Sequence, residues 1–179
     1  VAQFAIPEKV NGVTVLITDC EGEARSFGEP MAAFVSEDSD ASASTLFVTL
    51  PNFPILECLQ DGFVSVYEEG CPDCALEVME LPLTSLGKDV PERIVSALRA
   101  NPDIDYVVMT VDDLTSGLPA ALQAAGLADK VKIVGASSGT TNFQYIAAGQ
   151  QAAGVPNAFF EQPWQWVHAL ALIFTGGVL

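Results

Sequence analysis

The chain has 179 residues, half of them apolar, so it is long enough to bury a substantial core and is not a disordered segment. Its 23 Asp and Glu residues against 7 Lys and Arg give a formal net charge of -16, which repels phosphate backbones and argues against nucleic acid as a partner. No run of about 18 apolar residues is present, so no transmembrane span is predicted. No basic segment precedes the first apolar stretch, so we expect that a signal peptide has been removed or that the chain is a fragment.

The first quarter of the chain contains one predicted strand, residues 13–18, which ends in a polar loop that begins with Asp19. Residues 23–44 contain a short apolar run at 31–35 and then a polar stretch of low complexity at 36–44. We expect no full helix there, and we interpret residues 36–44 as the crossing between two lobes.

The rest of the chain alternates between β-branched runs and helical stripes. Strands that alternate with helices indicate right-handed crossovers and a doubly wound parallel sheet, so the predicted fold class is α/β. Ligands of such sheets bind at the carboxyl ends of the strands, which here include residues 110–113 and 135–138. The predicted strands are 45–50, 76–81, 105–110, 131–134 and 155–160, and the predicted helices are 54–70, 90–100, 114–125, 140–148 and 163–176.

The stretch A-N-P-D-I-D-Y-V-V-M-T-V-D-D-L-T-S-G-L-P-A-A-L-Q-A-A-G, followed by K-I-V-G and then G-T, resembles the type 1 periplasmic solute-binding proteins. This resemblance implies a two-lobed receptor of an ABC transporter that closes on a small solute, often a sugar, and works with a membrane permease. It implies no enzymatic activity and no cofactor. It also implies an exported protein, periplasmic or extracellular, with a lipid anchor as one option.

The resemblance covers nearly all of this chain but only about two-thirds of a family member. It implies a partial N-terminal lobe and crossover at 1–44, a nearly complete C-terminal lobe at 45–160, and a return helix of the N-terminal lobe at 161–179. Because helix 163–176 is apolar on several sides, we expect a dimer or a companion fragment that covers it.

Position by position, the resemblance implies a set of residues that face the solute. Relatives have an arginine where Glu57 stands, an Asn where Val111 stands, an acidic residue near Ser137 and a Gln near Glu161. An acidic cleft without arginine suits a cationic solute as well as a sugar or polyol. From the residues alone, Asp112 is equally well explained as a helix N-cap. The implied contacts are Asp19, Glu57, Val111, Asp112, Ser137 and Glu161.

The four cysteines comprise a C-x-x-C pair, Cys71 and Cys74, and two single residues, Cys20 and Cys58. We expect the pair to form a local disulfide, as suits an oxidising compartment, and we expect the other two to be free or only weakly reactive. A thioredoxin-like motif is less consistent with this pair, because Cys71 follows the end of a helix. The only histidine is His168, so we expect no metal site.

Two other functions stay open at this point. One is a ligand-sensing regulatory domain of the same fold. The other is a serine hydrolase, since G-A-S-S-G at residues 135–139 lies after a predicted strand and before a predicted helix. Its acid and base would have to come from Glu161 and His168, and His168 lies within an apolar helix.

Overall fold

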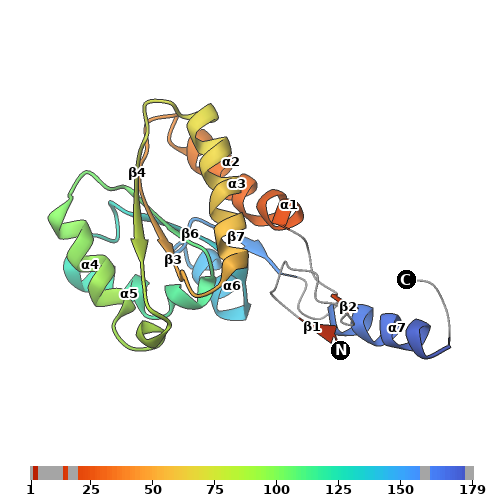
Figure 1. The fold of residues 1–179 in the computed structure, drawn as a ribbon. Helices are drawn as coiled ribbons and strands as arrows, with labels where there is room; N and C mark the ends of the chain where they lie inside the picture. The colour runs from red at the N-terminus through yellow and green to blue at the C-terminus, as the bar shows by residue number, and fades with distance from the viewer. Residues whose placement is uncertain (1, 4–13, 16–19, 158–161, 176–179) are drawn as a thin grey trace.

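The computed structural model describes residues 2–3, 14–15, 20–157 and 162–175. Its centre is a five-stranded parallel sheet in the order β4-β3-β5-β6-β7, which confirms the predicted α/β class (Figure 1). The strands of this sheet are β3 (Ser44–Thr49), β4 (Ala75–Glu80), β5 (Tyr106–Met109), β6 (Lys132–Ser138) and β7 (Ala153–Pro156). A separate parallel pair joins β1 (Ala2–Gln3) to β2 (Thr14–Val15).

Helices connect the strands and cover both faces of the sheet. The connections β3 to β4 and β4 to β5 cross the sheet in opposite directions, so right-handed crossovers place α3 and α4 on opposite faces. The helices are α1 (Cys20–Glu23), η1 (Ala24–Gly28), α2 (Glu29–Asp38), α3 (Pro54–Gly70), η2 (Leu83–Ser85), α4 (Val90–Ala100), η3 (Asp112–Thr115), α5 (Leu118–Ala125), α6 (Thr140–Ala147) and α7 (Gln162–Thr175).

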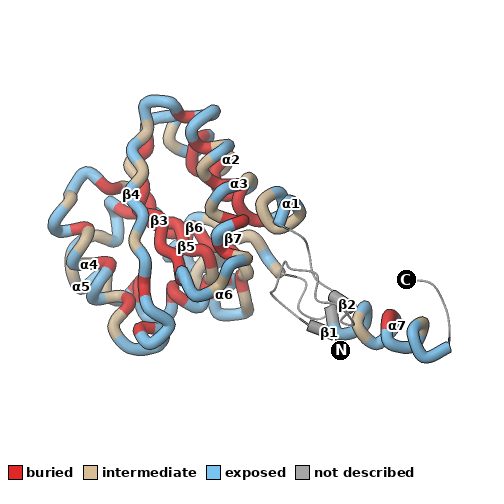
Figure 2. Tube along the Cα trace, in the orientation of Figure 1, coloured by how far each residue is buried: buried red, intermediate tan, exposed pale blue. Residues whose placement is uncertain are grey.

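The core between β3 and α3 follows the alternation of side chains along the strand. The ring of Phe47 lies 4.9 Å from that of Phe63, and Phe63 lies 5.1 Å from Tyr67, centroid to centroid. The Tyr67 hydroxyl also lies 2.8 Å from the Thr45 hydroxyl, so a buried polar group keeps a hydrogen bond. The odd-numbered residues of β3 therefore face α3, and buried segments follow β3, β5 and β6 in Figure 2.

Residues 20–38 are helical, so the expectation that no full helix fits between residues 23 and 44 is wrong. The helices η1 and α2 pack on α3, and this contact depends on close approach of the two backbones. A Cβ atom at Gly62 would lie 2.6 Å from the Cβ of Ala24, so only glycine fits there without a shift of the backbone. These contacts attach residues 20–38 to the five-stranded sheet, and the division into lobes stays a prediction.

The predicted helix 114–125 is broken into two pieces. Gly117 has φ of 80°, in the left-handed region, and separates η3 from α5. Gly126, with φ of 71°, ends α5 as an αL cap, as the sequence predicts.

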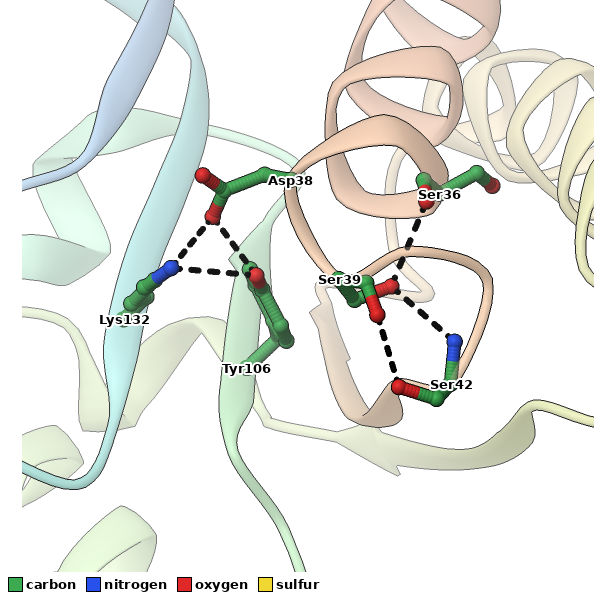
Figure 3. A network of polar contacts seen from close by, with 6 residues as sticks. All are labelled: Ser36, Asp38, Ser39, Ser42, Tyr106 and Lys132. Carbon is green, nitrogen blue, oxygen red and sulfur yellow. Dashed lines mark hydrogen bonds and ion pairs between the residues drawn. The ribbon is translucent and has the colours of Figure 1, made fainter.

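A polar cluster ties the end of α2 to the amino ends of β5 and β6 (Figure 3). Lys132 Nζ and the Tyr106 hydroxyl each donate to Asp38 Oδ2 over 2.6 Å. The hydrogen bonds from Lys132 and Tyr106 lower the pKa of Asp38. Burial and the hydrogen bond to Asp38 raise the pKa of Tyr106 to about 12. This cluster lies at the opposite edge of the sheet from the carboxyl ends of the strands, so we interpret it as structural.

All four cysteines lie in the described residues, and all are in disulfides. Cys71 is joined to Cys74 in the turn before β4, as the spacing predicts. Cys20 and Cys58 are joined to each other, so the expectation that they are free is wrong. The two residues are 38 positions apart, and the bond links α1 to α3.

The last described helix, α7, carries large exposed apolar side chains. Trp164 is 74% exposed and Phe174 is 85% exposed. Within the described ranges, no helix has both the length and the apolar character that crossing a bilayer requires.

Candidate functional site

The carboxyl ends of the strands form one edge of the sheet. Strand order reverses between β3 and β5, because the chain first moves to β4 on one side and later to β6 and β7 on the other. Ligands of open parallel sheets bind at such a reversal, outside the carboxyl ends. The residues that follow β3, β5 and β6 are therefore the first place to look for a site.

Two predicted contacts, Val111 and Ser137, stand at neighbouring strand ends. Met109 pairs with Gly135 in the register of β5 and β6, so Val111 and Ser137 lie at equivalent positions two residues further on. Ser137 has φ of 58°, and the pairing with β7 is irregular between Ala136 and Ser138. A non-glycine residue in this conformation at a bulge is strained, and such strain is common at binding sites. Both side chains are half-buried.

Asp112 points into the protein and is 2% exposed. Its carboxylate accepts hydrogen bonds from the hydroxyls of Ser138 and Thr115 and from Nε2 of Gln151, the last at 3.0 and 3.1 Å. The backbone oxygen of Asp112 also accepts from Nδ2 of Asn142 over 3.2 Å. Burial raises the pKa of Asp112, and the hydrogen bonds from Ser138, Gln151 and Thr115 oppose that shift. The network joins the ends of β5, β6 and β7.

The Asp112 carboxylate is turned toward these protein donors, and its direct contact with a solute stays a prediction. Val111 is the N-cap of η3 and Asp112 is its first residue, so the alternative role of Asp112 as N-cap is not observed. A Cβ atom at Gly135 would collide with the Asp112 carboxylate, which explains why β6 carries glycine at this position. The carboxylate therefore holds Ser138, and with it the strained backbone of Ser137.

Glu57 lies apart from this group, in the first turns of α3. It is exposed and lines a hollow of about 240 Å³ at the ends of β3 and β4. Three of the lining side chains are carboxylic acids. The hollow is lined by Thr49, Pro51, Glu57, Gln60, Asp61 and Glu80.

The other two predicted contacts, Asp19 and Glu161, lie outside the described residues. The prediction from sequence also missed residues that the structure brings into the site. Gln151 and Asn142 gave no signal, because their partner Asp112 is 39 and 30 positions away. Glu80 could have been suspected, because it lies next to the end of the predicted strand 76–81.

A family model described as a periplasmic binding protein domain matches residues 24–177. The chain belongs to this family. The predicted resemblance to type 1 periplasmic solute-binding proteins is thereby confirmed, and the family implies a location outside the cytoplasm. Among curated proteins, no match is found.

Solved structures with the same fold include three receptors. A periplasmic solute-binding protein of an ABC transporter from Actinobacillus succinogenes 130z, with bound D-allose, is 17% identical (TM-score 0.79, covering 88% of this chain and 56% of that one). A glucose-galactose binding protein from Geobacillus stearothermophilus is 15% identical, with a TM-score of 0.81, and the match covers 97% of this chain and 61% of that one. The fructose-binding periplasmic domain of the hybrid two-component system BT1754 is 14% identical, with a TM-score of 0.74, and the match covers 94% of this chain and 77% of that one. The chain spans about three-fifths of the length of the first two.

The family consists of binding proteins, which fits a receptor better than a serine hydrolase. His168 is exposed on α7, and no hydrogen bond joins it to Ser137 or Ser138 among the described contacts. Within the same residues, no group of three or more His, Cys, Asp or Glu side chains is placed to hold a metal ion.

Proposed function

We propose that this chain is part of a solute receptor of an ABC-type uptake system that binds a small polar solute, a sugar or polyol, between two lobes. The observation that carries the proposal is the strained Ser137 beside Val111 at the strand-order reversal, in a chain of the periplasmic binding protein family. The Ser137 hydroxyl and neighbouring backbone groups can exchange hydrogen bonds with sugar hydroxyls. Asp19 and Glu161 remain predicted contacts.

The receptor function includes a membrane partner. Closure of the two lobes around the solute is a hinge motion, and it would present the closed form to a permease. Binding of the solute makes and breaks no covalent bond, so the proposal includes no catalytic residue and no cofactor. A lipid anchor is compatible with this role.

The test is calorimetry with a panel of sugars and polyols on the protein produced from its complete gene. We expect binding, and we expect Ser137→Ala to weaken it by about tenfold, the effect of losing one hydrogen bond. Ser116→Ala, which changes an exposed serine near the same edge, is the control. Binding that is unchanged in Ser137→Ala would remove this serine from the site, and failure to bind any sugar or polyol would contradict the proposed solute class.

A second candidate is a ligand-sensing domain of a signalling protein. It is favoured by the structural likeness to the fructose-binding domain of a two-component system, of which this chain covers a larger share than of the transporter receptors. The complete gene distinguishes the two functions. A transmembrane helix followed by a kinase domain would support the sensor, and a neighbouring permease gene would support transport.

A further inference from the structure

The hollow at the ends of β3 and β4 is built on the α3 side of the sheet. Thr49 pairs with Glu80 in the parallel register, and paired residues of neighbouring strands project to the same face. Thr45 and Phe47 contact Tyr67 and Phe63, so Thr49 projects from β3 toward the first turns of α3. Glu57 and Asp61 stand one turn apart on that part of the helix.

The lining has a single sign of charge. Glu57, Asp61 and Glu80 are exposed, and none of them forms an ion pair or a hydrogen bond among the described contacts. Among the residues that the structure describes, no Lys or Arg lines the hollow, and the net charge of -16 adds to its negative potential.

A second observation is independent of the acidic residues. Thr49 is 4% exposed and lines the hollow, yet its hydroxyl has no hydrogen-bond partner among the described residues. Ser36 Oγ is the one fully buried polar side-chain atom without a partner in the described residues, so the Thr49 hydroxyl stays in contact with the solvent in the hollow. The hydroxyl is free of a protein partner in the described residues and can accept a hydrogen bond from a donor that enters the hollow.

We propose that this hollow binds an ammonium group, so that the receptor takes an amine-bearing polar solute; this inference rests on the proposed receptor function. An ammonium group supplies three donors, which match the Thr49 hydroxyl and the carboxylates of Glu57 and Glu80 in charge-assisted hydrogen bonds. The carboxylates do not converge as metal ligands in the described residues, which favours an organic cation over a metal ion. At about 240 Å³ the hollow is smaller than the roughly 300–1,000 Å³ of whole-ligand pockets, so it suits one group of the solute.

The experiment compares solutes that differ only in the charged group. D-Glucosamine is titrated against D-glucose, and 1,4-diaminobutane against 1,4-butanediol, by calorimetry at low salt on the protein from its complete gene. We expect each amine to bind at least about tenfold more tightly than its neutral counterpart, because hydrogen bonds to charged groups are the stronger ones. Added salt should reduce the difference, since the carboxylates are exposed.

Substitutions in the hollow test whether the amine binds there. Glu57→Gln and Glu80→Gln should each weaken amine binding about tenfold and weaken the binding of neutral solutes by less. Glu69→Gln removes the same charge from the exposed far end of α3 and is the matched control. Circular dichroism checks that each variant is folded.

The outcomes separate this inference from the proposed function. Neutral sugars that bind as tightly as their amines overturn the inference and leave the sugar receptor standing. A diamine that binds through Glu57 while no sugar binds supports the inference and overturns the sugar assignment. An equal loss in Glu69→Gln, or no binding by either amine, overturns the inference.

Discussion

Asp112 is a buried carboxylate that connects residues from several elements near the strand ends. If the carboxylate is removed, the Ser138 and Thr115 hydroxyls lose the acceptor of these hydrogen bonds, and Gln151 Nε2 keeps only its bond to the Ala153 oxygen. We expect Asp112→Ala to lower the free energy of unfolding by about 3 kcal/mol, since unsatisfied buried donors cost about 1–3 kcal/mol each and partly relax. Urea unfolding measures the change, and Asp113→Ala at the exposed neighbour is the control. Equal losses in both variants would contradict the role of the network.

Glu23 gives the protein a predicted pH dependence. Burial raises its pKa from 4.5 to about 7, so between these values the folded protein holds a proton that the unfolded chain releases. The contribution of Glu23 to the free energy of unfolding is therefore full below about pH 4.5, where the side chain is neutral in both states, and it declines as the pH rises to about 7. We expect Glu23→Gln to melt at a higher temperature than the parent at pH 8 and at the same temperature at pH 4. Glu37→Gln, which makes the same substitution at an exposed site, is the control.

At the scale of elements, the two disulfides should differ in their effect on stability. A cross-link restricts the unfolded chain more when it closes a longer loop, and the sequence separations are 38 for Cys20–Cys58 and 3 for Cys71–Cys74. The chain-entropy relation gives about 4 kcal/mol for the first bond and about 2 kcal/mol for the second. We expect replacement of Cys20 and Cys58 by Ala to destabilise more than replacement of Cys71 and Cys74 by Ala. Urea unfolding of both variants under non-reducing conditions tests this, and the reverse order would contradict it.

For the whole molecule, the apolar side chains of α7 predict association. Trp164 and Phe174 are largely exposed, and large apolar patches drive contact with a second surface. We expect this chain to self-associate in sedimentation velocity at high concentration, and we expect Trp164→Ser with Phe174→Ser to reduce it. Gln165→Ser on the same helix is the control. A monomer at all concentrations would show that these side chains do not form a contact between copies.

Local patterns were sufficient to predict the α/β class, the parallel sheet, most element positions and the bond between Cys71 and Cys74. They carry this information because apolar periodicity, β-branched runs and glycine caps act within a few residues of each other. The resemblance of residues 100–126 to a receptor family extended the prediction to function.

Contacts between distant residues decided the rest. The helix at 20–38 forms against α3, where Gly62 and Ala24 allow close packing that no local pattern reveals. The bond between Cys20 and Cys58 and the inward turn of Asp112 toward Gln151 join residues 38 and 39 positions apart. The acidic hollow needs the register of β3 with β4 to set Thr49 beside Glu80, under the first turns of α3. Such neighbours are set by how the layers pack, because strand order and crossover direction bring together side chains that sequence spacing keeps apart.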